Sequence, residues 1–216
     1  MECSFKYSHW KEILVEASRL GYALTSFKNY DPSMERVIIL RHDVDYSANV
    51  ETMARVEHEC GATATYFLRT HSSYYNPLSY RNYKTFKKLL TMGHEIGLHF
   101  DGIPFIGSFG ENLASVFKKD KELLEAMLNI EIVSASLHAF WTLPVPDYFG
   151  FNAGELGIEN YAYSPKFTKD MKYISDSRGG WQEGCLCSLL GKYPKIQCLT
   201  HPSWWYEKRE DAYDRW

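Results

Sequence analysis

Apolar residues in the first two thirds of the chain follow two alternating periods. Segments with apolar positions at helical spacing alternate with short runs of β-branched and aromatic residues. The predicted helices cover residues 8–19, 47–60, 80–92 and 112–128, and the predicted strands cover residues 37–42, 63–68, 94–98 and 132–137. Ser47 as a helix cap, and glycines after several helices, support these boundaries. Such an alternation is typical of an α/β domain with a parallel sheet.

The pattern loosens after residue 137. Prolines and glycines interrupt residues 144–154, and three further runs predict strands at residues 160–163, 173–175 and 195–200. Seven strands, with helices between the first four, favour an α/β barrel that is closed or partly open, and an open doubly wound sheet is the alternative. Both architectures bring the carboxyl ends of parallel strands to one rim.

Aspartate and histidine side chains follow the ends of four predicted strands. They are Asp43 and Asp45, His99 and Asp101, His138, and His201. Because these strand ends meet at one rim, we expect residues that are far apart in the sequence to converge there. Convergent carboxylates and imidazoles are the donor set of a metal hydrolase.

The two aspartates of the RHDVD segment carry the strongest chemical signal. Asp43 and Asp45 are two residues apart, so they share a face if the strand continues. Two adjacent carboxylates stay ionised at low cost only when a cation offsets their repulsion, which allows one to bind the cation and the other to handle a proton. The alternative is that one aspartate caps the following helix, although Ser47 can do so.

The histidines of the GHEIGLHFD segment differ in their predicted surroundings. His99 emerges at the end of a strand, with Asp101 on the same side if the chain stays extended. His94 lies on the opposite face by strand parity, and we interpret it as a structural histidine that bonds to the backbone. A buried histidine with satisfied nitrogens is also the alternative for His99.

Composition limits the classes of partner. At 216 residues, with 45% hydrophobic and 24% charged residues, the chain predicts a single domain over residues 1–216. A net charge of -3 and a pI near 6.2 give no broad basic field for nucleic acid. The start of the chain is too polar for a secretory signal and no apolar run reaches membrane-spanning length, so a cytoplasmic protein without a membrane span is expected.

The cysteines are five in number and none forms a CxxC pair, which favours a reducing compartment over a disulfide framework. Cys185 and Cys187 are potential ligands for a soft metal, but their position in a strand-like run favours packing. Aromatic residues reach 16%, and many lie in predicted loops, where exposed rings can stack on sugars. Trp181, Trp204 and Trp205 are therefore candidate pocket walls, and closure of the barrel end is the alternative.

Several motifs together resemble the polysaccharide deacetylases, the NodB-type carbohydrate esterases of family four. They are RHDVD, ATYFL, GHEIGLH, DSRGGW and LTHPSWW, and the similarity runs from about Val37 to Trp205. The resemblance implies a distorted (β/α)7 barrel that removes acetyl groups from N-acetylated sugars with a divalent metal, usually zinc. It also implies that Asp43 is the general base, Asp45 and His99 are metal ligands, and His201 is the general acid.

The chain departs from the pattern of this family at two positions. The second metal histidine is expected four residues after the first, where this sequence has Ile103. The Arg-Pro pair of the fourth strand is replaced by Ser136-Leu137-His138. We therefore predict His138 as the third ligand, which leaves a coordination position for water, and Asp101 is the other candidate.

The remaining candidates concern positioning and substrate. Asp176 is predicted to orient a histidine, or else to be a turn residue. Arg69 and His71 are predicted to meet a carboxylate or phosphate of the substrate, with a surface salt bridge as the alternative for Arg69. The HDVD-bearing subgroup is typical of surface-polysaccharide biosynthesis, so the resemblance implies a nucleotide-linked or lipid-linked sugar. Two alternatives stay open, namely a hydrolase of another C–N bond and a non-catalytic sugar-binding protein on the same fold.

Overall fold

The apolar run that begins at Val37 forms the central strand of a parallel sheet. In the computed structural model, which describes residues 3–101, 112–138 and 153–208, strand β2 spans Val37–Val44 and is buried along its whole length. The other strands are β1 (Ala23–Thr25), β3 (Thr65–Leu68), β4 (Glu95–Phe100), β5 (Ser134–Leu137), β6 (Asn160–Tyr161), β7 (Lys172–Ser175) and β8 (Lys195–Thr200). All seven predicted strands are present, and β1 is an additional one that the sequence did not predict.

The strand order is that of a barrel rather than a doubly wound sheet. All pairings are parallel, the order is β6-β5-β4-β3-β2-β8-β7, and β1 pairs with β2. If the two edges of this sheet were joined, the strands from β2 to β8 would follow one another in chain order, because the last strand, β8, pairs with β2. Within the described residues no pairing joins β6 to β7, so the sheet forms an open half-barrel. The predicted distorted α/β barrel is confirmed.

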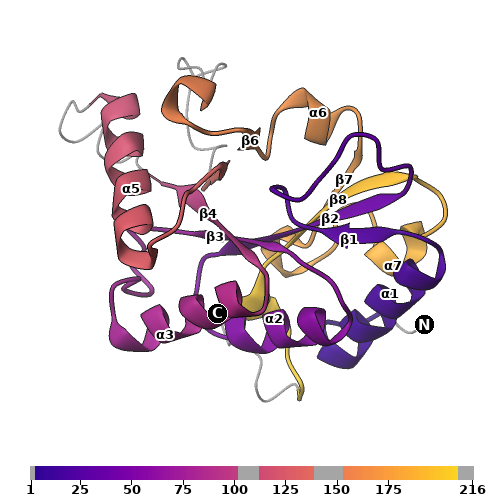
Figure 1. The fold of residues 1–216 in the computed structure, drawn as a ribbon. Helices are drawn as coiled ribbons and strands as arrows, with labels where there is room; N and C mark the ends of the chain where they lie inside the picture. Colours follow the sequence, from indigo (N-terminus) through magenta and orange to yellow (C-terminus); the bar gives the residue numbers. More distant parts are fainter. Residues whose placement is uncertain (1–2, 102–111, 139–152, 209–216) are drawn as a thin grey trace.

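The longer helices cover the outer surface of the half-barrel (Figure 1). They are α1 (Tyr7–Arg19), α2 (Val50–Glu59), α3 (Tyr80–Thr91) and α5 (Leu113–Leu128), and the short helices are α6 (Pro165–Thr168), α7 (Leu186–Leu189), η2 (Ala153–Leu156), η3 (Ser177–Gly179) and η4 (Pro202–Trp204). The prediction that Ser47 caps α2 was wrong. Asn49 precedes this helix in a left-handed conformation, with φ +66, and makes no side-chain cap hydrogen bond. No helix among the described residues has the length and apolar character needed to cross a membrane.

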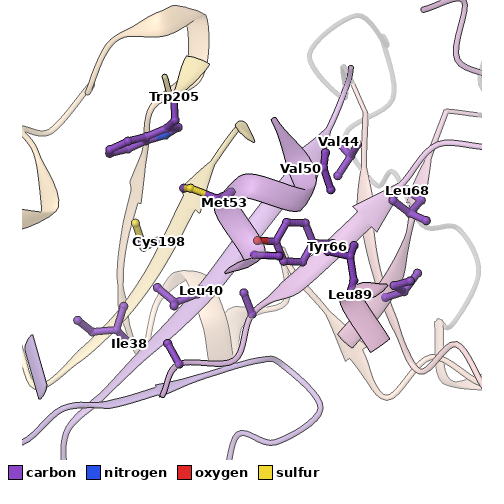
Figure 2. Packing of buried hydrophobic residues seen from close by; sticks show 14 of the residues in the cluster. Ile38, Leu40, Val44, Val50, Met53, Tyr66, Leu68, Leu89, Cys198 and Trp205 are labelled. Atoms are coloured by element: carbon purple, nitrogen blue, oxygen red, sulfur yellow. The ribbon is translucent and has the colours of Figure 1, made fainter. Parts of the chain in front are cut away.

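Alternation along β2 separates two cores of unequal size. Ile38, Leu40 and Val44 face the helices and join the large outer core with Met53 of α2 (Figure 2). The opposite face begins with Val37 and Ile39, which belong to a small inner core. Its other buried members are Phe27, Phe67, Ala162, Phe167 and Met171. These apolar side chains fill only the lower part of the barrel interior, so the upper part is left to polar residues.

Gly97 allows the inner core to form beneath the rim. A Cβ atom at this position would lie 2.5 Å from two ring atoms of Phe67 and 2.8 Å from the carbonyl oxygen of Ser134. The ring of Phe67 therefore occupies the space over β4 that a side chain would take. Because Gly97 lies two residues before His99 on the same face, the aromatic floor and the histidine above it are built by one strand.

Candidate metal centre

Three side chains from three strands converge at the carboxyl-terminal rim. Asp45 follows β2, His99 lies in β4 and His138 follows β5. Oδ1 of Asp45 lies 3.1 Å from Nδ1 of His138 and 3.6 Å from Nε2 of His99. The two imidazole nitrogens are 3.3 Å apart. Register explains the convergence, because His99 pairs with Ser136 across the two strands and His138 comes two residues later on the same face.

These donors fit a divalent metal. Tetrahedral zinc with bonds of about 2.0–2.2 Å to nitrogen and oxygen places its ligand atoms about 3.3–3.6 Å apart. The observed separations lie within or close to that range. Oδ1 of Asp45 is buried and has no hydrogen-bond partner among the described residues, as expected for an atom that binds an ion. Three protein donors leave a fourth position for water or substrate.

Ser136 connects the donor set to the second aspartate. Its hydroxyl lies 2.7 Å from Nδ1 of His99 and donates to Oδ1 of Asp43 at 3.4 Å. A hydroxyl that donates to the carboxylate can accept from Nδ1–H, which leaves the lone pair on Nε2, the atom that faces Asp45. In the sequence, Ser136 was noted only because it stands where the family motif has another residue. Its role in orienting His99 was missed.

Asp43 is held by Arg41, a partner that the sequence reasoning also missed. Nε and one terminal nitrogen of Arg41 donate to the two oxygens of Asp43 at 2.9 and 2.8 Å, and both side chains are buried. Burial alone would raise the pKa of Asp43, but the charges of Arg41 and His99 outweigh it and lower the pKa. The carboxylate is therefore ionised at neutral pH. Strand parity offered a signal, because residues 41, 43 and 45 share one face.

Asp45 and His201 face each other across the rim. Oδ2 of Asp45 lies 3.8 Å from Nε2 of His201, and Nδ1 of His201 lies 2.6 Å from Oδ1 of Asp176. Burial disfavours the charged imidazole, but the charge and hydrogen bond of Asp176 and the charges of Asp45 and Asp43 raise the pKa of His201 to about 9. Burial likewise opposes ionisation of Asp45, yet the adjacent imidazoles of His138 and His99 hold its pKa well below the usual value.

Asp176 lies where an orienting residue would be needed. Its Oδ1 faces His201, and its Oδ2 accepts hydrogen bonds from the backbone N–H of His201 at 3.1 Å and from Nε1 of Trp205 at 3.2 Å. The imidazole of His201 is thus held at one nitrogen while the other faces the rim.

Asp101 does not join the metal donors. Oδ2 of Asp101 accepts from Nε and a terminal nitrogen of Arg69 at 2.8 and 2.7 Å. Another terminal nitrogen of Arg69 lies 3.8 Å from Oδ1 of Asp45. Asp101 was the alternative third ligand, and this ion pair directs its carboxylate to Arg69 instead. The pair is buried, so Arg69 is not in the surface salt bridge that was the alternative for it.

His71 lies against helix α5 rather than among the donors. Its Nε2 is 2.7 Å from Oδ1 of Asp120, and this hydrogen bond raises the pKa of His71 despite partial burial. Ile103, where the family pattern expects a histidine, lies outside the described residues.

A cleft of about 710 Å³ opens at the metal donors. It is lined by Asp45, Tyr46, Arg69, Ser73, Tyr74, His138, Arg178 and Trp204. Of the three predicted tryptophan walls, only Trp204 lines it. Trp205 is fully buried against Trp10, with ring centroids 5.0 Å apart, and Trp181 stacks on Phe5. The alternative interpretation, closure of the barrel end, fits these two rings.

The sequence reasoning missed the two tyrosines of the cleft. The rings of Tyr46 and Tyr74 lie 4.3 Å apart between centroids, and Tyr74 is 61% exposed. Both residues lie in segments that follow strands, where aromatic loop residues were already a signal for sugar contact.

Comparison with known proteins gives a fold match but no sequence match. No family model and no curated protein matches the chain. A mutant of BA3943, described as a pseudoenzyme of the CE4 family with restored enzymatic activity, superposes with a TM-score of 0.51 at 13% identity over 80% of this chain and 58% of its own. The polysaccharide deacetylase Bc1974 from Bacillus cereus superposes with a TM-score of 0.50 at 16% identity over 77% of this chain and 79% of its own.

These two structures share the fold of this chain, and the resemblance read from its motifs is confirmed at that level. The chain spans only 58% of the length of the first of them.

Proposed function

We propose that the protein is a metal-dependent hydrolase that removes an acetyl group from an N-acetylated sugar or sugar-linked intermediate of surface-polysaccharide biosynthesis. The observation that carries this proposal is the donor set of Asp45, His99 and His138, with separations of 3.1–3.6 Å, at the mouth of a cleft. The fold shared with a polysaccharide deacetylase supports the reaction class. Zinc is the expected ion, because two nitrogen donors and one oxygen donor in a tetrahedral arrangement suit it.

The chain supplies a proton acceptor and a proton donor beside the ion site. A divalent ion there supplies Lewis acidity, which polarises the amide carbonyl and makes water more acidic. Asp43, kept ionised by Arg41, accepts the proton of the attacking water. His201 donates a proton from Nε2, the nitrogen that faces the rim, to the departing amine. Asp176 holds the opposite nitrogen of His201 during this transfer.

The cleft provides contacts for a sugar and for an anionic carrier group. The rings of Tyr46, Tyr74 and Trp204 offer apolar faces to a pyranose ring. The guanidinium groups of Arg69 and Arg178 line the same cleft and suit a phosphate. This combination favours a nucleotide-linked or lipid-linked N-acetyl sugar over an uncharged polymer.

Acetate release from N-acetylated sugar nucleotides and from chitooligosaccharides tests the proposal. We expect Asp43→Asn to abolish turnover while the metal content at the rim stays near that of the wild type, because Asp43 is not among the three donors. We expect His99→Ala to lose both turnover and the rim metal. His58→Ala, an exposed histidine on α2, is the matched control and should change neither. Full activity of Asp43→Asn would refute the assignment of the base.

The same assay separates the two alternatives. Ammonia or a ring-opened product in place of acetate would identify a hydrolase of another C–N bond. A non-catalytic sugar-binding protein would bind the sugar without stoichiometric metal at the rim, and Asp45→Ala would leave that binding unchanged. The second outcome has a structural precedent, since the fold is shared with a protein described as a pseudoenzyme.

A further inference from the structure

A second group of metal-binding side chains lies away from the cleft, between the start of the chain and helix α7. It consists of Cys3, His9, Cys185 and Cys187, whose donor atoms all lie within 4.8 Å of one another. Nε2 of His9 and Sγ of Cys185 are already 3.4 Å apart. His9 lies in α1, Cys185 directly precedes α7, and Cys187 lies in α7.

The start of the chain and the segment that leads into α7 are each held in place by hydrogen bonds to the backbone. The backbone N–H of Tyr7 donates to the carbonyl of Tyr206 at 3.0 Å, and the N–H of Tyr206 donates to the carbonyl of Phe5 at 3.0 Å. These bonds anchor the chain just after Cys3. Cys185 precedes α7, and its carbonyl accepts from both the N–H and the hydroxyl of Ser188, at 2.9 and 2.8 Å.

The donor set has the composition of a structural zinc site. Three thiolates and one imidazole are a common closed set for tetrahedral zinc, with Zn–S bonds of about 2.3 Å and therefore sulfur atoms about 3.8 Å apart. The upper limit of 4.8 Å means that no two sulfur atoms must close by more than about 1 Å to reach this geometry. Cys185 and His9 are buried, whereas Cys187 is half-buried and Cys3 is exposed, so an ion can enter from solvent.

His9 provides an independent indication. Its ring is 2% exposed, and Nδ1 has no hydrogen-bond partner in the part of the chain that the structure describes. This nitrogen lies 3.6 Å from Oε2 of Glu12, one turn along α1. When Nε2 binds an ion, Nδ1 carries the proton and faces a carboxylate, which is the usual arrangement around a histidine ligand.

We propose that Cys3, His9, Cys185 and Cys187 bind a structural zinc ion that fastens the start of the chain to α7. All four positions are filled by protein, so this ion takes no part in hydrolysis. The sequence favoured packing for Cys185 and Cys187, and both side chains do pack in or against the outer core, although they lie at the start of a short helix rather than in a strand. A disulfide would use only two of the three thiols and would leave His9 without a partner.

Metal stoichiometry of the rim variant tests this site independently of the proposed function. We expect the wild-type protein, kept reduced, to hold about two zinc ions per chain. His99→Ala and Cys187→Ser should each hold about one, and the double variant should hold about none. Cobalt-loaded His99→Ala should show thiolate-to-cobalt charge-transfer absorption, and this absorption should be lost from His99→Ala/Cys187→Ser. Cys60→Ser alters a half-buried cysteine outside the group and should retain full metal content.

Two results would overturn the proposal. The first is that His99→Ala binds no zinc and shows no thiolate-to-cobalt absorption while circular dichroism shows that the variant is folded. The second is a thiolate–cobalt absorption that stays unchanged in each of two double variants, His99→Ala/Cys187→Ser and His99→Ala/Cys3→Ser. Cys3→Ser changes an exposed residue, so loss of metal in this variant cannot be attributed to unfolding.

Discussion

Two histidine–carboxylate clusters lie on opposite faces of β2, and they differ in how completely their polar atoms are paired. On the outer face, Nε2 of His42 donates to Oε1 of Glu57 at 2.6 Å, and both residues are fully buried. Nε1 of Trp10 donates to the same oxygen at 3.2 Å, and the hydroxyl of Tyr66 donates to Oε2 at 2.7 Å. Nδ1 of His42 lies 2.6 Å from the hydroxyl of Thr200, so every side-chain nitrogen and oxygen atom of this closed cluster has a partner among the described residues.

On the inner face, the rim cluster of Asp45, His99 and His138 is open. Its nitrogen and oxygen atoms face a common point without pairing fully among themselves, and Asp45 and His138 line the cleft. A closed cluster of this kind stabilises the packing of helices on a sheet, whereas an open cluster keeps its binding capacity for a ligand. The same residue types therefore serve different purposes on the two faces, and pairing rather than residue identity distinguishes them.

The largest expected effect concerns the closed cluster. Glu57→Leu leaves the imidazole of His42, the indole N–H of Trp10 and the hydroxyl of Tyr66 without their acceptor in a dry interior. We expect the free energy of unfolding to fall by about 3–5 kcal/mol, while zinc affinity at the rim stays unchanged. Urea denaturation and zinc titration measure the two quantities.

Glu59→Leu on the same helix is the control, because Glu59 is exposed and its ion pairs with Lys11 and Arg55 are superficial. It should change stability by less than about 0.5 kcal/mol. A cost for Glu57→Leu as small as that of the control would show that the closed cluster does not stabilise the fold.

The pH dependence of stability should separate the two faces. In metal-free protein, the raised pKa of His201 contributes stability that is fully present below pH 6.5 and lost as the pH rises through about 9. The difference in unfolding free energy between wild type and His201→Gln should therefore shrink by roughly 2–4 kcal/mol between the two ends of that range. Chelator-treated samples unfolded in urea at several pH values give this difference, and a constant difference would contradict the ion pair with Asp176.

The closed cluster should respond at the opposite end of the scale. Burial raises the pKa of Glu57, but the charge and hydrogen bond of His42 outweigh it and lower the pKa below 4.5. Its contribution is therefore present above pH 4.5 and lost as the pH falls through the lowered value. The free energies of unfolding of Glu57→Leu and of the wild type should therefore approach each other as the pH falls, which urea denaturation at several acidic pH values measures.

The smallest expected effect concerns the hydroxyl that links the rim cluster to Asp43. Ser136→Ala removes the partner of Nδ1 of His99, so the imidazole loses its preferred tautomer and orientation. We expect zinc affinity at the rim to fall about 10–100-fold with little change in stability. Isothermal titration of a Cys187→Ser background isolates the rim site.

Ser134→Ala is the matched control for this change. Ser134 lies two residues earlier on the same face of β5 and donates to Glu95 rather than to His99. It should leave zinc affinity unaffected. Equal losses in the two variants would indicate a general disturbance of β5 and would remove the argument for Ser136.

Local pattern was sufficient for the strands and for the position of the rim. The run that ends at Leu40 predicted a buried strand, and the parity argument for His94 was confirmed, since its Nε2 lies 2.9 Å from the carbonyl of Ala54. The same reasoning failed for Trp205, because adjacency to His201 in sequence says nothing about which side of the chain a ring takes. Trp205 turns into the outer core, whereas Trp204 reaches the cleft.

Pairing across long sequence distances was beyond the reach of local pattern. Ser136 meets His99 and Asp43 only because β5 lies beside β4 and the barrel curves toward β2. The partners of His42 come from α1, α2, β3 and β8. The group around His9 likewise depends on the approach of His9 in α1 to Cys185, which is 176 residues away in the sequence.

The sequence by itself determined which segments become strands, which face of each strand is apolar, and that aspartates and histidines stand at the strand ends. Those properties follow from the side-chain period of an extended chain, which repeats every two residues. The tertiary structure decided which of these polar side chains are paired and which stay open to a ligand. Pairing depends on the register between strands and on the helices that cover one face, and neither is encoded in the residues next to the site.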